Sequence, residues 1–311
     1  MGGGILAGLA AGALWGLVFV APRMVTGWSS VDLTAGRFLT YGAFSTLLLL
    51  WPALLGRPLR LPSWSQARAA ALMSVLGFSG YYLLLVFSIR DAGSEVPSLI
   101  IGTIPIWMMI LGKPVGLRWA ALLPGLVLTL AGLGLMMQSV YTGAMESAST
   151  PTAITDAGSG LFFWRGVALA CASMVCWTAF GLMNSRWLKQ HPDVDVTTWA
   201  NWLGVATGLG ALLLWLVAGS EVNVLLAHKD SAQAAMICVA TGIGSAWIAT
   251  ILWNIASQRL SASLCGQLIV SETIFALLLS FLWDGQWPSL VQASAVGLFV
   301  VGILASIRAH R

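Results

Sequence analysis

Long apolar stretches alternate with short polar ones along the whole chain. Most of the apolar stretches are about 20 residues long, which is the length that an α-helix needs to cross the hydrocarbon core of a bilayer. Only helices and closed barrels satisfy all their backbone hydrogen bonds in hydrocarbon. The pattern therefore predicts an all-α membrane protein with ten transmembrane helices, the fourth of them short, at about 3–22, 33–55, 69–89, 95–111, 119–141, 161–184, 196–218, 232–256, 263–283 and 288–307.

The longest polar interruption, from Thr142 to Gly160, is rich in Ser, Thr, Ala and Gly. It lies between the fifth and sixth predicted helices, so it divides the chain into two halves of five helices each. We interpret residues 1–141 as a first five-helix repeat, 142–160 as an extracytoplasmic linker and 161–311 as a second five-helix repeat.

Short motifs recur in the same order in the two halves. A unit of five spans begins and ends on opposite sides of a membrane, so a second copy must be inverted relative to the first. Inverted repeats are typical of secondary transporters, which bind their substrate near the membrane midplane between the repeats. The matched motifs are Ala13-Leu14-Trp15-Gly16 with Val175-Cys176-Trp177-Thr178, Asp32-Leu33-Thr34 with Asp195-Val196-Thr197, and Gly77-Phe78-x-Gly80 with Ala246-Trp247-x-Ala249.

The composition excludes a soluble protein. Charged residues make up 8% of the 311 residues and hydrophobic residues 58%, and the mean hydropathy is +0.87. Soluble proteins carry roughly 25% charged residues, because water must solvate their surface. The net charge of +4 is spread over the loops without forming a basic patch, so we expect no nucleic-acid partner. The expected partners are the lipid bilayer and a small-molecule substrate, with monomer and dimer both left open.

Residue types that catalyse reactions or bind metals are scarce inside the predicted helices. The four cysteines lie in apolar segments without a CxxC pair, and the three histidines lie in loops or at the tail. We therefore expect no disulfide, metal site or cofactor. The chain lacks a GxxxxGK[ST] loop for ATP. An enzyme is not expected.

Lysine and arginine residues are unevenly divided between the two predicted sides. Cytoplasmic loops of membrane proteins carry an excess of both. One side, which includes both termini, has ten and the other has four, so both termini of a multi-pass inner-membrane protein are predicted to be cytoplasmic. The ten are Arg57, Arg60, Arg68, Lys113, Arg118, Arg186, Lys189, Arg259, Arg308 and Arg311, and the four are Arg23, Arg90, Arg165 and Lys229.

Four segments resemble motifs of the EamA family in the drug/metabolite transporter superfamily. They are Ala13-Leu14-Trp15-Gly16-Leu17-Val18-Phe19-Val20-Ala21 in the first span, Ala35-Gly36-Arg37-Phe38-Leu39 in the second, Ile104-Pro105-Ile106-Trp107 in the fourth and Ser271-Glu272-Thr273-Ile274-Phe275-Ala276-Leu277 in the ninth. The resemblance covers nearly the whole chain and implies export by a ten-helix transporter. Thr273 stands where the family usually has proline, so the resemblance implies no kink there.

Within this superfamily, the chain is similar to the aromatic amino acid exporters. The residues that carry this similarity are Tyr81, Trp177, Asn184 and the pair Trp253-Asn254. Those exporters tend to have tryptophan just before the fourth-span proline, where this chain has Ile104. The similarity favours amino acids, with aromatic ones among them, as substrates.

Two charged residues within the predicted spans are candidates for a functional or structural role. Glu272 lies about 14 Å from the start of the ninth span, where a charge costs about 2.5–3.5 kcal/mol. It would contact a substrate amine or bind a proton; the alternative is a neutral residue that hydrogen-bonds between helices. Arg37 lies about one turn inside the second span, and we interpret it as a structural residue that pairs with Asp32 or with a helix end.

Proline and tryptophan residues provide further candidates. Pro105 removes one backbone hydrogen bond of the fourth span and frees the carbonyl of Ile101, which makes either a cavity wall or an ordinary kink. Trp15, Trp177 and Trp247 lie near mid-span, away from the membrane interfaces where tryptophan is usual. Their indole N–H groups need partners there. A hydrated cavity would provide them, and helix packing is the alternative.

Together these observations predict a secondary transporter with a central cavity between its repeats. It would export small amphipathic metabolites, most of all amino acids, by alternating access. Export of other metabolites, organic cations or drugs stays open. A phosphate or nucleotide-sugar exchanger on the same fold needs cationic residues inside the later spans, where only Arg259 is near. The predicted substrate-binding residues are Trp15, Phe78, Tyr81, Tyr82, Trp177 and Trp247 as apolar walls, with Thr103, Pro105, Ser245, Asn254, Ser271 and Glu272.

Overall fold

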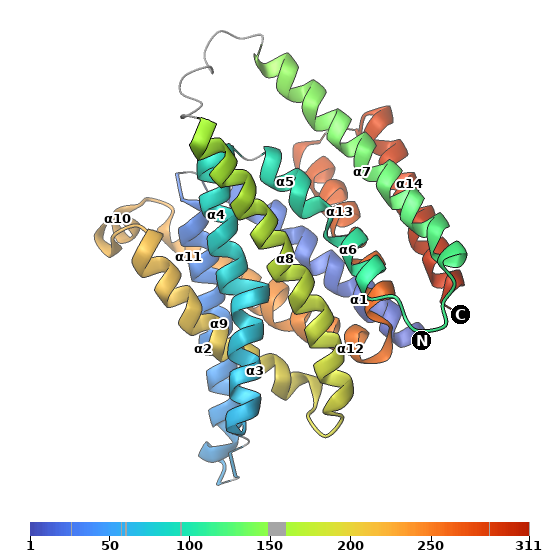
Figure 1. The fold of residues 1–311 in the computed structure, drawn as a ribbon. Coiled ribbons are helices and arrows are strands. Elements are labelled where there is room, and N and C mark those ends of the chain that lie inside the picture. Colours follow the sequence, from blue (N-terminus) through green and yellow to red (C-terminus); the bar gives the residue numbers. More distant parts are fainter. Residues whose placement is uncertain are drawn as a thin grey trace.

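The computed structural model describes residues 1–25, 27–56, 58–59, 61–93, 95–148, 160–285 and 287–310, and its regular secondary structure is helical (Figure 1). The elements are α1 (Gly2–Gly16), η1 (Leu17–Phe19), η2 (Ala21–Met24), α2 (Ser30–Leu54), α3 (Trp64–Ser74), η3 (Val75–Ser79), α4 (Gly80–Ala92), α5 (Glu95–Gly102), α6 (Ile104–Leu111), α7 (Trp119–Ala148), α8 (Gly160–Gln190), α9 (Val196–Ala218), α10 (Val222–Ala227), α11 (Ser231–Thr241), η4 (Gly242–Ile248), α12 (Ala249–Arg259), α13 (Ala262–Asp284) and α14 (Leu290–Ala309).

The described helices agree with the predicted spans. Nine continuous helical stretches are long and apolar enough to cross a membrane, and the shorter apolar stretch Val96–Leu111 lies where the short fourth span was predicted. Thr103 separates α5 from α6, and Pro105 occupies the first turn of α6, where a missing N–H is tolerated. The fourth span is therefore interrupted beside its proline.

The helix before the predicted linker is longer than expected. The helix α7 continues to Ala148, so the first part of the 142–160 segment is helical. Residues 149–159 lie outside the described residues, as do Arg57, Arg60 and Arg311, which entered the charge comparison. The division into two repeats and a linker remains a prediction at this point.

Side-chain caps fix the starts of the second and seventh spans. The Ser29 hydroxyl accepts a hydrogen bond from the backbone N–H of Asp32 at the start of α2. At the start of α9 the Asp195 carboxylate accepts from the backbone N–H groups of Thr197 and Thr198. These caps satisfy N–H groups that have no partner within the helix. In α9 the cap is the first residue of the matched motif, Asp195, whereas in α2 the cap Ser29 precedes the matched Asp32 by three residues.

A second shared feature is a π-helical segment within a span. The third span changes from α3 to the π-helix η3 and then to α4, and the eighth changes from α11 to the π-helix η4 and then to α12. Both segments include residues of the matched Gly77 and Ala246 motifs. A π-helical turn is uncommon and concentrates at functional sites, so its occurrence at both places supports a structural correspondence.

Corresponding helices of the two halves pack directly against one another. Extensive contacts join α2 to α9 and α7 to α14, while α1 packs along α12 and α13, and α4 along α8. The α2–α9 contact depends on two glycines. A Cβ atom added to Gly42 would lie 2.6 Å from the Cα of Gly208, so these backbones touch.

Gly4, Gly8, Gly12 and Gly16 recur every four residues on one face of α1, and this face packs closely against the second half of the chain. A Cβ on Gly8 would meet Leu268, and one on Gly16 would lie 2.9 Å from the backbone N of Ala276. The first helix thus lies in direct contact with α13.

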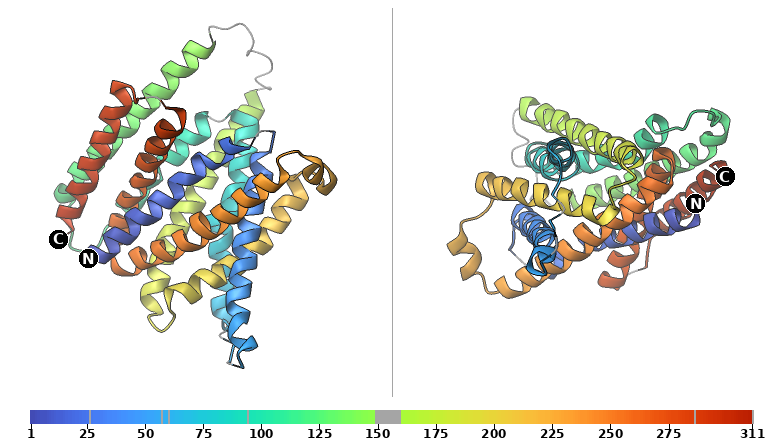
Figure 2. Two further views of the ribbon diagram at one scale, coloured as in Figure 1. Left: turned by 180° about the vertical axis from the view of Figure 1, so that it is seen from behind. Right: turned by 90° about the horizontal axis from the view of Figure 1, so that it is seen from below.

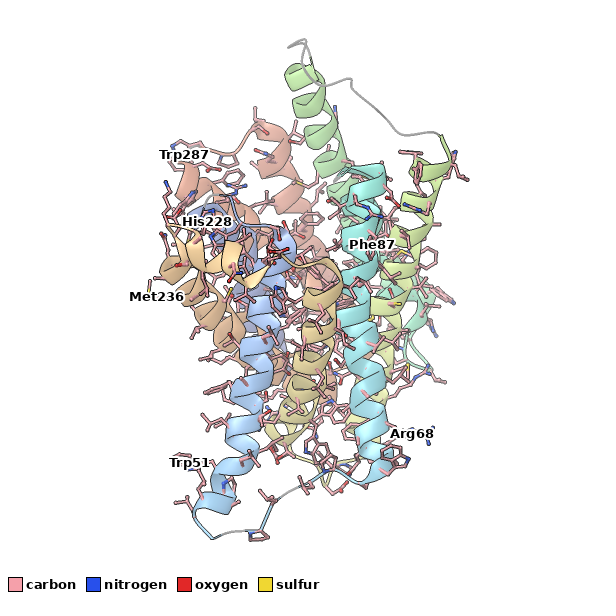
Figure 3. The ribbon with its side chains drawn as sticks, turned by 90° about the vertical axis from the view of Figure 1, so that its left-hand side faces the viewer. Trp51, Arg68, Phe87, His228, Met236 and Trp287 are labelled. Atoms are coloured by element: carbon pink, nitrogen blue, oxygen red, sulfur yellow. The ribbon has the colours of Figure 1, made fainter. Side chains whose placement is uncertain are left out.

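Both termini lie next to each other at one end of the bundle (Figures 1 and 2). The same long axis separates Trp51 and Arg68 at one end from His228 and Trp287 at the other (Figure 3). We call the first the terminal end, because α1 starts and α14 finishes there, and the second the distal end. Ten apolar helical stretches with both chain ends at the same end are consistent with an even number of crossings.

Candidate functional site

A cavity lies inside the bundle toward its distal end. It has a volume of about 80 Å³, which is enough for several water molecules. Its walls come from the α1–α2 connection, α2, α4 and α11, so both halves of the chain contribute. The lining residues are Val18, Ala21, Ser30, Leu33, Thr34, Arg37, Tyr82, Ile237 and Thr241.

One face of α2 supplies most of the polar lining. Ser30, Thr34 and Arg37 follow each other at spacings of four and three residues, which places them on the same side of a helix. Ser30 is exposed and marks the mouth, whereas Thr34 is buried. Arg37 lies roughly 10 Å along the helix from Ser30, given 1.5 Å per residue. The guanidinium group therefore lies well inside the bundle.

Among the described residues, Arg37 has no ion-pair partner. Its Nε atom is buried without a hydrogen-bond partner, and its guanidinium carbon lies 4.5 Å from the ring centre of Phe38. The predicted partner is engaged elsewhere, because the Asp32 carboxylate accepts hydrogen bonds from Ser29 and from the Ser220 hydroxyl and backbone N–H. The interpretation of Arg37 as a structural partner of Asp32 is therefore wrong.

Glu272 is the acidic residue that the sequence places inside the ninth span. It interacts electrostatically with Arg37, although the described structure places no ion pair or hydrogen bond between them. It lies on α13 where Gly12 of α1 approaches, with the Gly12 Cβ position 3.1 Å from the Glu272 backbone N. Its side chain is only partly buried. Arg37 of the first half lines the cavity, whereas Glu272 of the second half is not among its lining residues.

Aromatic rings from several helices surround the cavity and the region below it. Tyr82 lines the cavity and packs edge-on against Phe38, whose ring also meets Phe78 at 5.8 Å. Phe78 in turn contacts Phe180 of α8 at 5.5 Å. Tyr81, next in sequence to Tyr82, also interacts electrostatically with Arg37. This aromatic group connects the cavity with the centre of the bundle.

The central tryptophans form a separate cluster. Trp15 and Trp177 have ring centres 6.4 Å apart, and each also packs against Trp253 of α12, at 5.5 and 6.0 Å. The two residues that the repeat comparison matched are therefore in direct contact. The Trp253 indole N–H is buried without a partner, so one polar group of this cluster is available to water or to a ligand.

Other predicted site residues use their polar groups in hydrogen bonds within or between helices. Ser245 donates to the carbonyl of Leu14 at 2.6 Å, and Ser271 donates within its own helix to Leu268 at 2.7 Å. The Trp247 indole donates to Asn201 at 2.7 Å. These three polar groups do not meet Arg37 at the cavity in this conformation.

The interrupted fourth span also uses its polar group locally. The Thr103 hydroxyl donates to the carbonyl of Ile100 at 2.6 Å, lies 3.2 Å from the sulfur of Met174 and accepts from the Trp107 indole. Pro105 is buried in the following turn. Neither residue lines the distal cavity.

Packing closes the region between the tryptophan cluster and the terminal end. Asn184 donates to Asn254 at 3.0 Å and accepts from the Trp199 indole at 2.8 Å, and both asparagines are fully buried. Further toward the terminal end, Lys189 donates to the carbonyl of Leu260 at 2.6 Å. Within the described part of the chain, the cavity therefore opens toward the distal end and is closed toward the terminal end.

Several cavity residues were not singled out from the sequence. Ser30, Thr34 and Thr241 are hydroxyl residues near span ends, which are common there. The sequence did contain a signal for α2 as a lining helix, because the spacing of Ser30, Thr34 and Arg37 places all three on one helical face.

A larger hollow of about 450 Å³ lies at the terminal end, beside the helix ends. Its lining comes from Met1, Pro114, Gly116, Leu117, Arg259, Leu260, Ser261, Leu264, Ala309 and His310. Its lining residues include no Phe, Tyr or Trp, and it lies apart from the aromatic clusters described above. Among the described residues, no group of three His, Cys, Asp or Glu side chains has the arrangement of a metal site.

The bundle of apolar helices, with a charged cavity that both halves line, defines a multi-pass membrane transporter. The chain belongs to the EamA-like transporter family, whose sequence profile matches it twice, at residues 2–138 and 164–308. These two matches show that the family's domain is duplicated in the chain.

Comparisons with individual proteins agree with this assignment. The chain is 31% identical over 325 residues to "Inner membrane protein YtfF" of Escherichia coli (strain K12), in an alignment that covers 98% of this chain and 95% of that protein. It also resembles a solved structure titled "Crystal structure of protein", with a TM-score of 0.70, 22% identity and 98% of each chain covered. The second likeness concerns the fold alone.

Proposed function

We propose that this transporter exports small amphipathic metabolites, with amino acids, including aromatic ones, as the favoured class. It would act in the inner membrane by alternating access, with both termini in the cytoplasm. The observation that carries this proposal is the distal cavity itself. It combines charged, hydroxyl and aromatic groups, takes its walls from both halves of the chain, and is separated from the terminal end by packed helices.

Inverted repeats support the alternating-access part of the proposal. A five-helix unit that occurs twice must enter the membrane in opposite senses, and equivalent helices then meet around a common axis. The contacts of α2 with α9 and of α7 with α14 fit this relation, and a π-helical segment occurs in both the third and the eighth span. A cavity formed at one end by the first repeat has an equivalent at the other end that the second repeat can form.

The two ends differ in the way that such a mechanism requires. At the terminal end, α8 packs against α12 through Ser185, whose hydroxyl donates to the Ser257 carbonyl at 3.0 Å. At the distal end, the segment after α1 and the helix α4 form different walls of the cavity, with Val18 and Tyr82 as lining residues. This asymmetry corresponds to a state that is open toward the distal, extracytoplasmic side.

The favoured substrate class follows from the lining. Aromatic rings provide apolar surface, and hydroxyl and charged groups bind the polar end of an amphipathic solute. Exchange of phosphates or nucleotide sugars has less support, because Arg37 is the one Lys or Arg among the lining residues of the distal cavity and Arg259 lies at the terminal hollow.

The direct test is flux in proteoliposomes that contain the purified protein. Labelled amino acids, sugars, organic acids and organic cations would be compared with and without a pH gradient. We expect amino acids to move faster than in protein-free liposomes. Movement of sugars or organic cations without any amino acid would overturn the substrate assignment, and absence of a pH effect would exclude proton coupling.

A further inference from the structure

The Arg37 guanidinium is a cation inside the bundle that the protein itself leaves without an anion. It lines the distal cavity, its Nε atom is buried and unpaired, and the described chain places no carboxylate within ion-pair distance of it. Arginine cannot lose its proton in a protein. A charge within a membrane is costly, and such residues usually mark a substrate or ion pathway.

The surroundings of Arg37 favour a carboxylate as the missing anion. The guanidinium fork matches the two oxygens of a carboxylate and binds them with two parallel hydrogen bonds. The lining includes no second Lys or Arg. A phosphate dianion would therefore meet a single positive charge and would be repelled by nearby Glu272. The hydroxyl groups of Thr34 and Thr241 add neutral donors for one singly charged group.

Glu272 of α13 supplies a negative charge from the second repeat, outside the residues that line the cavity. It acts electrostatically on Arg37 without forming an ion pair, and its side chain is partly accessible. A solute that carries both a carboxylate and an ammonium group fits between two such charges, because each end meets its opposite. The aromatic side chains Tyr82 and Phe78 lie on the same side of the bundle for an apolar substituent.

We propose that Arg37 binds the carboxylate of the transported solute and that Glu272 faces its ammonium group. This inference rests on the proposed transport of amino acids and specifies which end of the molecule each repeat holds. Arg37 belongs to α2 of the first repeat and Glu272 to α13 of the second. A zwitterionic substrate therefore connects the two repeats, whereas a solute with one charge engages only one of them.

The test measures how far each probe raises the thermal unfolding temperature of the full chain in detergent. Tryptophan fluorescence reports the unfolding. The probes are L-phenylalanine, phenylacetate, L-phenylalanine methyl ester and 2-phenylethylamine. The first two have a free carboxylate, and the last two have an amine without a carboxylate. The variants are Arg37→Gln, Arg37→Lys and Thr34→Val, with Arg186→Gln as a matched control because Arg186 is exposed and lies away from the cavity.

We expect wild-type protein to bind L-phenylalanine more tightly than its methyl ester. Arg37→Gln should weaken binding of L-phenylalanine and phenylacetate roughly 10- to 100-fold, the effect of losing hydrogen bonds to a charged group. It should leave 2-phenylethylamine binding unchanged or stronger. Arg37→Lys should have an intermediate effect, since lysine keeps the charge but not the planar fork. The control should match wild type.

Two results would overturn the inference. One is equal binding of the carboxylate probes by Arg37→Gln and wild type. The other is a wild-type protein that does not distinguish acid from ester. If Arg37→Gln does not fold, Arg37→Lys and Thr34→Val decide the question by the same acid-to-ester ratio. Carboxylate binding that depends on Arg37, together with no amino acid flux in proteoliposomes, would refute the proposed function and leave this binding site standing.

Discussion

At the scale of single residues, the charged groups of the spans differ from the polar groups around them. Ser245, Trp247 and Asn254 each hydrogen-bond to another helix, so their polarity is used in packing. No hydrogen bond of this kind joins Arg37 or Glu272 to another residue within the described part of the chain. Sequence position alone could not separate the two kinds, because a serine and an arginine at similar depth differ only in what the neighbouring helices bring to them.

Replacement of Glu272 tests the acidic half of the candidate site. Glu272→Gln keeps the shape and removes the charge, so flux of amine-bearing substrates should fall roughly tenfold or more, the value of a charge-assisted hydrogen bond. The measurement is initial flux per folded protein in proteoliposomes. Glu221→Gln, at the exposed start of α10, is the control and should behave as wild type. Normal flux in Glu272→Gln would assign Glu272 to structure.

Trp177 tests the central tryptophan cluster. Its side chain is half-buried against Trp15 and Trp253, so Trp177→Ala should widen the centre of the bundle and reduce flux several-fold. Trp164→Ala on the same helix is the control, because Trp164 is 67% exposed. The amounts of folded protein come from size-exclusion chromatography. Wild-type flux in Trp177→Ala would assign the residue to packing.

At the scale of elements, span lengths and the interruption of the fourth span followed from the sequence. Hydrocarbon thickness sets the number of apolar residues in a helix, and Pro105 marks the place where a helix cannot continue unchanged. The π-helical segments η3 and η4 were not predicted. They add a residue to a turn in response to neighbouring helices, which no local pattern describes. The lining face of α2 depends on the same tertiary contacts.

The contact between α2 and α9 makes a prediction about stability. Gly42→Ala places a methyl group 2.6 Å from the Cα of Gly208, where the close atom is backbone and cannot rotate away. The substitution should destabilise the protein by about 1–3 kcal/mol, as overpacking does. Gly134→Ala in α7 is the matched control, because nothing lies within 4 Å of its added Cβ. Thermal unfolding in detergent compares the two, and equal midpoints would contradict direct backbone contact.

At the scale of the whole molecule, the repeat relation links two places that look different in this structure. The matched motifs place Asp32 opposite Asp195, a difference of 163 residues, so Thr34 corresponds to Thr197 and Arg37 to Ala200. Arg37 lines an open cavity, whereas Ala200 is fully buried and accepts a hydrogen bond from Tyr41 at 2.6 Å. If the surroundings of Arg37 closed and those of Ala200 opened, the distal-open state would become a terminal-open one.

Accessibility of these two positions to a thiol reagent tests the exchange. Thr34→Cys and Ala200→Cys would be made separately in a variant without Cys171, Cys176, Cys238 and Cys265, and an impermeant maleimide applied to right-side-out and inside-out vesicles. Because Thr34 lines the distal cavity, Thr34→Cys should react from the extracytoplasmic side. Ala200→Cys should react slowly and only from the cytoplasmic side, since its environment must first open. A disulfide that holds Ala21→Cys to Ile237→Cys across the distal cavity should stop Thr34→Cys labelling and speed Ala200→Cys labelling. Labelling of both positions from one side, or rates at Ala200→Cys that ignore the cross-link, would separate the two sites and remove alternating access from the proposed function.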